Sequence, residues 1–135
     1  MTANRAQLLI ANEIDSPWAQ SLESRLRPLP IDMHWTHSDS EAIDVFAGKI
    51  MHLAVVDGAL PGGGINLVRR VRSMGLSLPT LLVCDHPDQR LLQDALALNV
   101  YSVVTPESQD IITPVVFRVF RQVYRFDWAT TDSAN

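Results

Sequence analysis

The chain has 135 residues, of which 47% are hydrophobic, and its formal net charge is −4. This length fits one domain with a full core, and the single cysteine, Cys84, excludes a disulfide within the chain. The acidic balance argues against general nucleic-acid binding, and no apolar run approaches the length of a membrane span. We therefore expect a cytoplasmic domain in a reducing compartment, with neither nucleic acid nor membrane as a partner.

Short apolar segments alternate along the chain with segments of helical periodicity. The first apolar segment shows no polar alternation, which predicts burial on both faces, whereas the second alternates as an edge strand does. The third ends in a carboxylate, Asp57, and a turn rich in proline and glycine follows it. The five expected strands are 7–11, 31–36, 53–57, 79–84 and 100–104.

The segments between the strands carry signals for helix starts. Ser16 before Pro17 suits an N-cap followed by a first-turn proline, and Ser38 with Glu41 fits a capping box. The fifth helix either kinks at Pro114 or begins at the residue before it. The third helix, over 65–74, is expected to expose its arginines, Arg69, Arg70 and Arg72. The fourth is expected to carry a broad apolar face formed by Leu91, Leu92, Ala95, Leu96 and Leu98.

This alternation of strands and helices, with doubly buried central strands, indicates an α/β fold with helices on both faces of a parallel sheet. The single-domain, doubly wound, flavodoxin-like fold with strand order 2-1-3-4-5 fits the chain length. The domain would occupy residues 1–126, leaving 127–135 as a disordered tail or the start of a linker. In that order the carboxyl ends of the first and third strands are neighbours, which predicts that Asn12 and Glu13 lie near Asp57.

Asn12 and Glu13 follow the first strand, Asp57 ends the third, and Pro61 stands four residues later. Over residues 7–125 this arrangement resembles a response-regulator receiver domain with the CheY-like fold. The family carries an acidic pair after its first strand and a phosphoacceptor aspartate in the place of Asp57. The resemblance implies a signalling module of a two-component phosphorelay. It is not expected to be an enzyme beyond autophosphorylation at Asp57 from a phosphodonor.

The positions after the fourth and fifth strands depart from the family. Its threonine or serine at the end of the fourth strand is here Cys84, and its lysine–proline pair is here Thr105 and Pro106. Ser102 stands where an aromatic switch residue is usual. Without the lysine a transferred phosphoryl group loses a charge-assisted hydrogen bond, worth about 1.5–3 kcal/mol. We expect a module that acts mainly through protein–protein interaction, with phosphorylation at Asp57 lost or inefficient.

The resemblance also implies a metal site at this edge of the sheet. In the family Mg²⁺ is held by the second acid of the pair, the phosphoacceptor and a backbone carbonyl two residues beyond it, which correspond to Glu13, Asp57 and Ala59. These oxygen atoms are hard ligands of the kind Mg²⁺ prefers, and Asn12 keeps an oxygen but loses a charge. We expect weak Mg²⁺ binding and no cofactor that the domain requires.

Two alternative functions use the same part of the chain. One is a working receiver that a histidine kinase phosphorylates on Asp57 in the presence of Mg²⁺. The remoter one is a cysteine phosphatase, because Cys84 and Arg90 have the C-x₅-R spacing of phosphate-binding loops. Asp85 and Asp88 lie between them and would repel a phosphate, which favours a buried cysteine and an exposed arginine without catalytic roles.

The resemblance places partner contacts on the fourth helix, the fifth strand and the fifth helix. Acidic residues on the fourth helix and arginines on the fifth suit a two-fold contact with a second copy, or docking of another protein. The apolar and aromatic stripes of the fifth helix together are too wide for one helix to bury entirely. The predicted interaction face is Asp88, Asp94, Tyr101, Ser102, Phe117, Arg118, Phe120, Arg121 and Tyr124.

Overall fold

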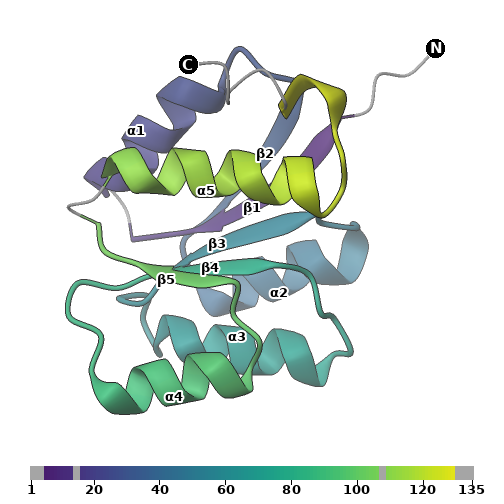
Figure 1. The fold of residues 1–135 in the computed structure, drawn as a ribbon. Helices are drawn as coiled ribbons and strands as arrows, with labels where there is room; N and C mark the ends of the chain where they lie inside the picture. The colour runs from purple at the N-terminus through teal and green to yellow at the C-terminus, as the bar shows by residue number, and fades with distance from the viewer. Residues whose placement is uncertain (1–4, 14–15, 107–108, 130–135) are drawn as a thin grey trace.

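Parallel strands form one five-stranded sheet in the order β2-β1-β3-β4-β5, which confirms the predicted fold class (Figure 1). The computed structural model describes residues 5–13, 16–106 and 109–129. The strands are β1 (Ala6–Ala11), β2 (Ile31–Thr36), β3 (Leu53–Asp57), β4 (Thr80–Val83) and β5 (Ser102–Val104). The helices are α1 (Pro17–Leu26), α2 (Asp39–Gly48), α3 (Gly64–Ser73), α4 (Gln89–Ala97) and α5 (Gln109–Gln122). Among the described residues no helix is long and apolar enough to cross a membrane.

Helices cover both faces of the sheet, with α1 and α5 on one face and α2, α3 and α4 on the other (Figure 1). Successive residues of β1 point to opposite faces, as the two-residue period of a strand requires. Leu8 and Ile10 join the core under α1 and α5, whereas Leu9 and Ala11 join the core on the other face. The central strands are therefore buried on both sides, and β2 forms an edge as its alternation predicted.

The helix boundaries bear out two start signals and correct a third. The Ser38 hydroxyl accepts a hydrogen bond from the backbone N–H of Glu41 over 3.2 Å, as the capping box predicts. Ser16 is the N-cap residue of α1 and Pro17 lies in the first turn, as predicted, although the Ser16 side chain makes no capping hydrogen bond. The fifth helix begins at Gln109 and continues through Pro114, so a start just before Pro114 is wrong. A proline at this depth removes one helical hydrogen bond, and the buried face of α5 holds the helix together.

The apolar face of α4 is buried only in part. Leu92 and Leu96 are 46% and 79% exposed, and within α4 only Ala95 is buried. The helix lies beside α3 (Figure 1), and the neighbouring edge strand β5 is only three residues long. A short edge strand offers little surface to cover, so the outer leucines of α4 stay in contact with solvent.

Arg72 is not on the outside of α3 as expected, because its side chain is half-buried between α3, α4 and β4. Its guanidinium donates to the carbonyl oxygen of Leu98 over 2.8 Å and to that of Leu76 over 3.2 Å. A third bond of 3.3 Å joins it to the Thr80 hydroxyl. Burial lowers the pKa of Arg72 from its ordinary value. One arginine thus ties the end of α4 to the start of β4.

The chain turns back after α5, so the expected boundary at residue 126 is wrong for residues 127–129. Arg125 has a positive φ of 58°, and the backbone N–H of Phe126 then donates to the carbonyl oxygen of Phe120 over 3.0 Å. Residues 127–129 form a short 3₁₀ turn whose last residue is fully buried. The ring of Trp128 lies 5.4 Å from that of Phe120. Aromatic packing therefore orders these three residues; the rest of the expected tail lies outside the described residues.

Candidate functional site

Asp57 is the last residue of β3, at the carboxyl end of the strand, and it is only 9% exposed. One carboxylate oxygen, Oδ1, accepts a hydrogen bond from the backbone N–H of Ala59 over 2.9 Å. The next residue, Gly58, donates its backbone N–H to the carbonyl oxygen of Val83 over 2.7 Å. The turn therefore fixes the carboxylate at the carboxyl end of the sheet, where open α/β sheets place their sites.

The glycines after Asp57 have conformational roles in this turn. Gly62 and Gly63 have φ angles of 86° and 91°, a region that L side chains rarely adopt. A Cβ atom on Gly64 would lie 2.3 Å from the carbonyl oxygen of Asp57, so α3 begins in direct contact with the Asp57 backbone. The glycine run thus allows the tight turn between Asp57 and α3.

Ser16 is a site residue that the sequence reading missed. Its hydroxyl donates to the carbonyl oxygen of Glu13 over 2.8 Å and lies 3.5 Å from Oδ2 of Asp57. The side chain is buried and links the loop after β1 to the end of β3. The Ser-Pro pair indicated a helix start, and only the pairing of β1 with β3 reveals that this serine faces Asp57.

Asn12 and Glu13, the pair after β1, point in different directions. The Asn12 side-chain amide donates to the carbonyl oxygen of Glu13 over 2.7 Å, and its own Oδ1 is buried with no hydrogen-bond partner among the described residues. Asn12 lines a separate recess with Trp35 and α1, whereas Glu13 is exposed and lines the pocket beside Asp57. Only one member of the predicted pair therefore contributes its side chain to the site.

A pocket of about 480 Å³ opens beside Asp57 and brings together residues from the ends of β1, β3, β4 and β5. It is lined by Glu13, Ser16, Pro17, Trp18, Asp57, Gly58, Ala59, Cys84, Asp85, His86 and Pro106. Five of the predicted site residues thus lie together, while Asn12 and Thr105 are not among the described residues of its wall. A methyl group on Gly58 would contact Cβ of Cys84 at 3.5 Å, which shows how closely the ends of β3 and β4 approach.

The charges around this pocket are mostly negative. Three carboxylates line it, those of Glu13, Asp57 and Asp85, and the described lining residues include neither lysine nor arginine. The imidazole of His86 is the one basic group among them. The oxygens of Glu13, Asp57 and Ala59 share one pocket, a donor set that fits a hard cation such as Mg²⁺. Among the described residues, however, no cluster of three or more metal-ligating side chains is formed, so the fit is that of a weak site.

The C-x₅-R loop does not form a phosphate cradle in this structure. Cys84 lines the pocket, but Arg90 lies exposed in the first turn of α4 and is not among the described lining residues. Asp88 accepts the backbone N–H of Leu91 over 2.8 Å as the cap of that helix. The arginine is therefore not placed to share a phosphate with the thiol.

Some residues of the predicted interaction face are buried. Phe117 and Phe120 are buried in the core, because residues 127–129 fold over the part of α5 that was expected to be open. Tyr124 is half-buried against His52, at the amino end of β3. Asp94 forms an exposed ion pair of 3.6 Å with Arg69 of α3 within the chain. The other predicted residues of this face are also exposed or half-buried, namely Asp88, Tyr101, Ser102, Arg118 and Arg121.

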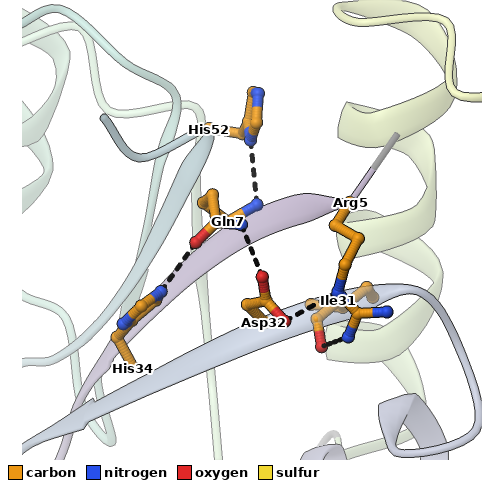
Figure 2. A network of polar contacts seen from close by, with 6 residues as sticks. All are labelled: Arg5, Gln7, Ile31, Asp32, His34 and His52. Atoms are coloured by element: carbon orange, nitrogen blue, oxygen red, sulfur yellow. Dashed lines mark hydrogen bonds and ion pairs between the residues drawn. The ribbon is translucent and has the colours of Figure 1, made fainter. Parts of the chain in front are cut away.

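A second polar cluster lies at the opposite edge of the sheet, at the amino ends of β1, β2 and β3 (Figure 2). The Gln7 side chain links β1 to β2. Its Nε2 donates to Asp32 over 2.7 Å, and its Oε1 lies 2.8 Å from Nε2 of His34. Arg5 forms an ion pair of 2.8 Å with Asp32. These hydrogen bonds, first from Gln7 and then from Arg5, lower the pKa of Asp32.

No protein-family model and no curated protein matches the sequence. Solved structures with a similar fold include the signal receiver domain of an HD domain-containing protein from Pseudomonas fluorescens Pf-5, at TM-score 0.80 and 19% identity, covering 91% of this chain and 100% of that one. The signal receiver domain of a putative LuxO repressor protein from Vibrio parahaemolyticus matches at TM-score 0.76 and 14% identity, covering 96% of each chain. A CheY-like receiver domain from Methanospirillum hungatei JF-1 matches at TM-score 0.73 and 14% identity, covering 91% and 100%. The chain therefore has the receiver fold along nearly its whole length.

Proposed function

We propose that this chain is a receiver-like signalling module of a two-component phosphorelay that works mainly by binding proteins, with phosphorylation at Asp57 lost or inefficient. The observation that carries the proposal is the pocket beside Asp57, whose described lining has three carboxylates and neither lysine nor arginine. A phosphoryl group would add negative charge there, and phosphoryl transfer depends on positioned cations. Cys84 offers only a weak donor in place of a hydroxyl. On this proposal the chain is not an enzyme in its own right.

A working receiver, phosphorylated on Asp57 by a histidine kinase, is the second candidate. It is favoured by the shared pocket of Glu13, Asp57 and Ala59. The Glu13 carboxylate, the Asp57 carboxylate and the Ala59 carbonyl would hold Mg²⁺, and the bound ion would supply positive charge for phosphoryl transfer. Oδ1 of Asp57 already accepts the Ala59 N–H, which leaves Oδ2 as the freer oxygen for the metal or the phosphoryl group.

The surface for protein binding is, on this proposal, the face of α4, β5 and α5. Its apolar part is the exposed pair Leu92 and Leu96 on α4, together with the exposed Tyr101 before β5. Its charged part is Asp88 on one side and Arg118 on the other, a combination that suits a second copy in a two-fold contact. The lone Cys84 thiol fits a module that works in the reducing cytoplasm.

The decisive experiment is a ¹H–¹⁵N NMR titration of the whole chain with Mg²⁺ and then with beryllofluoride, which mimics a phosphoryl group on an aspartate. We expect small shifts confined to the residues around Asp57 in the wild-type chain. The double variant Cys84→Thr/Thr105→Lys restores a hydroxyl and a cation, and it should respond with shifts that reach Tyr101 and α5. The same large shifts in the wild-type chain, lost in Asp57→Asn, would contradict the proposal and establish the working receiver.

A further inference from the structure

A recess separate from the Asp57 pocket lies at the amino ends of β3 and β4, the opposite edge of the sheet. It has a volume of about 270 Å³ and is formed by two segments, 46–51 and 76–78. The first segment joins α2 to β3 and the second joins α3 to β4 (Figure 1). The two pockets share no described lining residue, so a ligand in this recess would not compete for the site at Asp57.

The inner surface of the recess is apolar. Phe46 and Met51 are buried in the core behind it, and Leu76 and Leu78 are half-buried at its side. At the rim Ile50 is 85% exposed, the most exposed of the large apolar side chains described. A single exposed isoleucine is ordinary, but here it extends an apolar surface that continues into the recess. Such a surface favours the apolar part of a ligand.

The one charged side chain of the recess is a cation. Lys49 is the only lysine of the chain, it is exposed, and no described residue forms an ion pair with it. No aspartate or glutamate lines the recess among the described residues. Its charge acts on His34, where it adds to burial in lowering the pKa of that imidazole. The lysine backbone is held in place by a 2.9 Å hydrogen bond to the carbonyl oxygen of Val45.

We propose that this recess binds a small organic acid, with its carboxylate on Lys49 and its aromatic or alkyl body against Phe46, Met51 and Leu78. One cation matches a single negative charge, and the lining offers no second cation for a ligand with several phosphates. An organic cation would meet Lys49 unfavourably, and a wholly polar ligand would leave the apolar lining without a partner. An apolar acid is the class that satisfies both parts of the recess.

The test uses naphthalene-2-carboxylate and the matched neutral compound naphthalene-2-carboxamide, each titrated into ¹⁵N-labelled chain. We expect the acid to shift the amide signals of residues 46–51 and 76–78 in a saturable way. The amide should bind about threefold to tenfold more weakly, the range for one partly exposed charge-assisted contact. In Lys49→Met, which keeps an apolar stem, the acid should lose that advantage, whereas Lys49→Arg should keep it.

Equal binding of acid and amide to the wild-type chain would overturn the proposal, as would an unchanged preference in Lys49→Met. Saturable shifts at the Asp57 pocket instead of the recess would do the same. Lys49 is exposed, so its substitution is not expected to unfold the domain, and the spectrum of the free variant checks this directly. The result does not depend on phosphorylation, so the proposed function can fail while this site stands.

Discussion

The backbone N–H of Gln7 donates a hydrogen bond to Nδ1 of His52 over 2.8 Å, and the backbone N–H of His52 donates to the Gln7 carbonyl oxygen over 2.8 Å (Figure 2). An acceptor nitrogen carries no proton, so the folded chain holds His52 in its neutral form. The rings of Tyr124 and Phe126 lie 4.9 Å and 5.3 Å from the imidazole. The turn that follows α5 therefore packs on a neutral histidine.

Acidification should lower the free energy of unfolding through His52. Burial lowers the pKa of His52 below its ordinary 6.5, so its stabilising contribution is full above pH 6.5 and is lost as the pH falls through 6.5 toward the lowered value. The lost hydrogen bond is worth up to about 1 kcal/mol. Of the other titratable groups nearby, Tyr124 has a raised pKa and stays neutral over this range, and Asp32 has a lowered pKa and stays ionised.

The measurement is urea denaturation at about pH 7.5 and about pH 5.5, on either side of the ordinary histidine pKa. His34 also has a lowered pKa, through burial first and Lys49 second, and contributes with the same sign. The control is therefore His52→Asn, whose side-chain oxygen accepts the Gln7 N–H without titrating. The variant should lose less stability than the wild-type chain between the two pH values, and equal losses would contradict the role of His52.

Substitution by alanine is expected to change the free energy of unfolding in opposite directions at Gly64 and at Gly48. In Gly64→Ala the new Cβ would lie 2.3 Å from the Asp57 carbonyl oxygen and 2.9 Å from the Cα of Gly58, which are backbone atoms that cannot move aside. We expect a loss of about 3 kcal/mol or more in the free energy of unfolding. In Gly48→Ala nothing lies within 4 Å of the new atom, and alanine should gain about 0.5–1 kcal/mol by restricting the unfolded chain. Parallel urea curves check both signs, and similar effects at the two sites would refute the close approach of α3 to Asp57.

Substitutions of Arg72 and Arg69 test whether the contribution of an arginine to stability depends on its position on α3 or only on its charge. Arg72→Met keeps the apolar stem but leaves the carbonyl oxygens of Leu98 and Leu76 without their donors, so a loss of about 2 kcal/mol is expected. Arg69→Met breaks an exposed ion pair with Asp94 and an exposed hydrogen bond to Asn66, surface contacts that we expect to be worth less than about 1 kcal/mol. Thermal unfolding of the two variants side by side makes the comparison. Equal losses would mean that the bonds of Arg72 add nothing beyond a surface charge.

Local patterns were sufficient to predict the strands and the place of Asp57 at the end of the third. Residue periodicity indicates the buried first segment and the alternating second one, and the residue type alone marks the carboxylate that ends the third. These signals depend only on neighbours in sequence. The Ser38 cap is equally local, since its hydroxyl reaches a backbone N–H only three residues away. Each of these features is confirmed because the interaction that produces it spans a few residues.

Features that depend on distant parts of the chain could not be predicted in this way. Ser16 reaches Asp57 only because β1 and β3 pair, which brings residues 41 positions apart together. The burial of Phe117 depends on Trp128, which returns over α5 after a chain reversal at Arg125. A wide aromatic stripe on one helix therefore did not indicate an exposed surface, because a second segment was available to cover it.

The exposed leucines of α4 lead to a prediction about self-association. Leu96 is 79% exposed and lies one turn from Leu92, which is 46% exposed, on the face proposed to contact a second copy. Leu96→Glu would place a charge in the apolar centre of that contact, and burial of an unpaired charge is costly. Sedimentation velocity over a concentration series should show a dimer for the wild-type chain and at least about tenfold weaker association for the variant.

The matched control is Ile50→Glu, which adds the same charge at an even more exposed apolar position, 85% exposed, in the connection between α2 and β3. Neither substitution should change the free energy of unfolding by more than about 0.5 kcal/mol, because both side chains lie on the surface. A loss of association in Leu96→Glu alone would place the contact on α4. A wild-type chain that stays monomeric at every concentration, or an equal effect of both variants, would rule out a dimer through this face and leave a different protein as its partner.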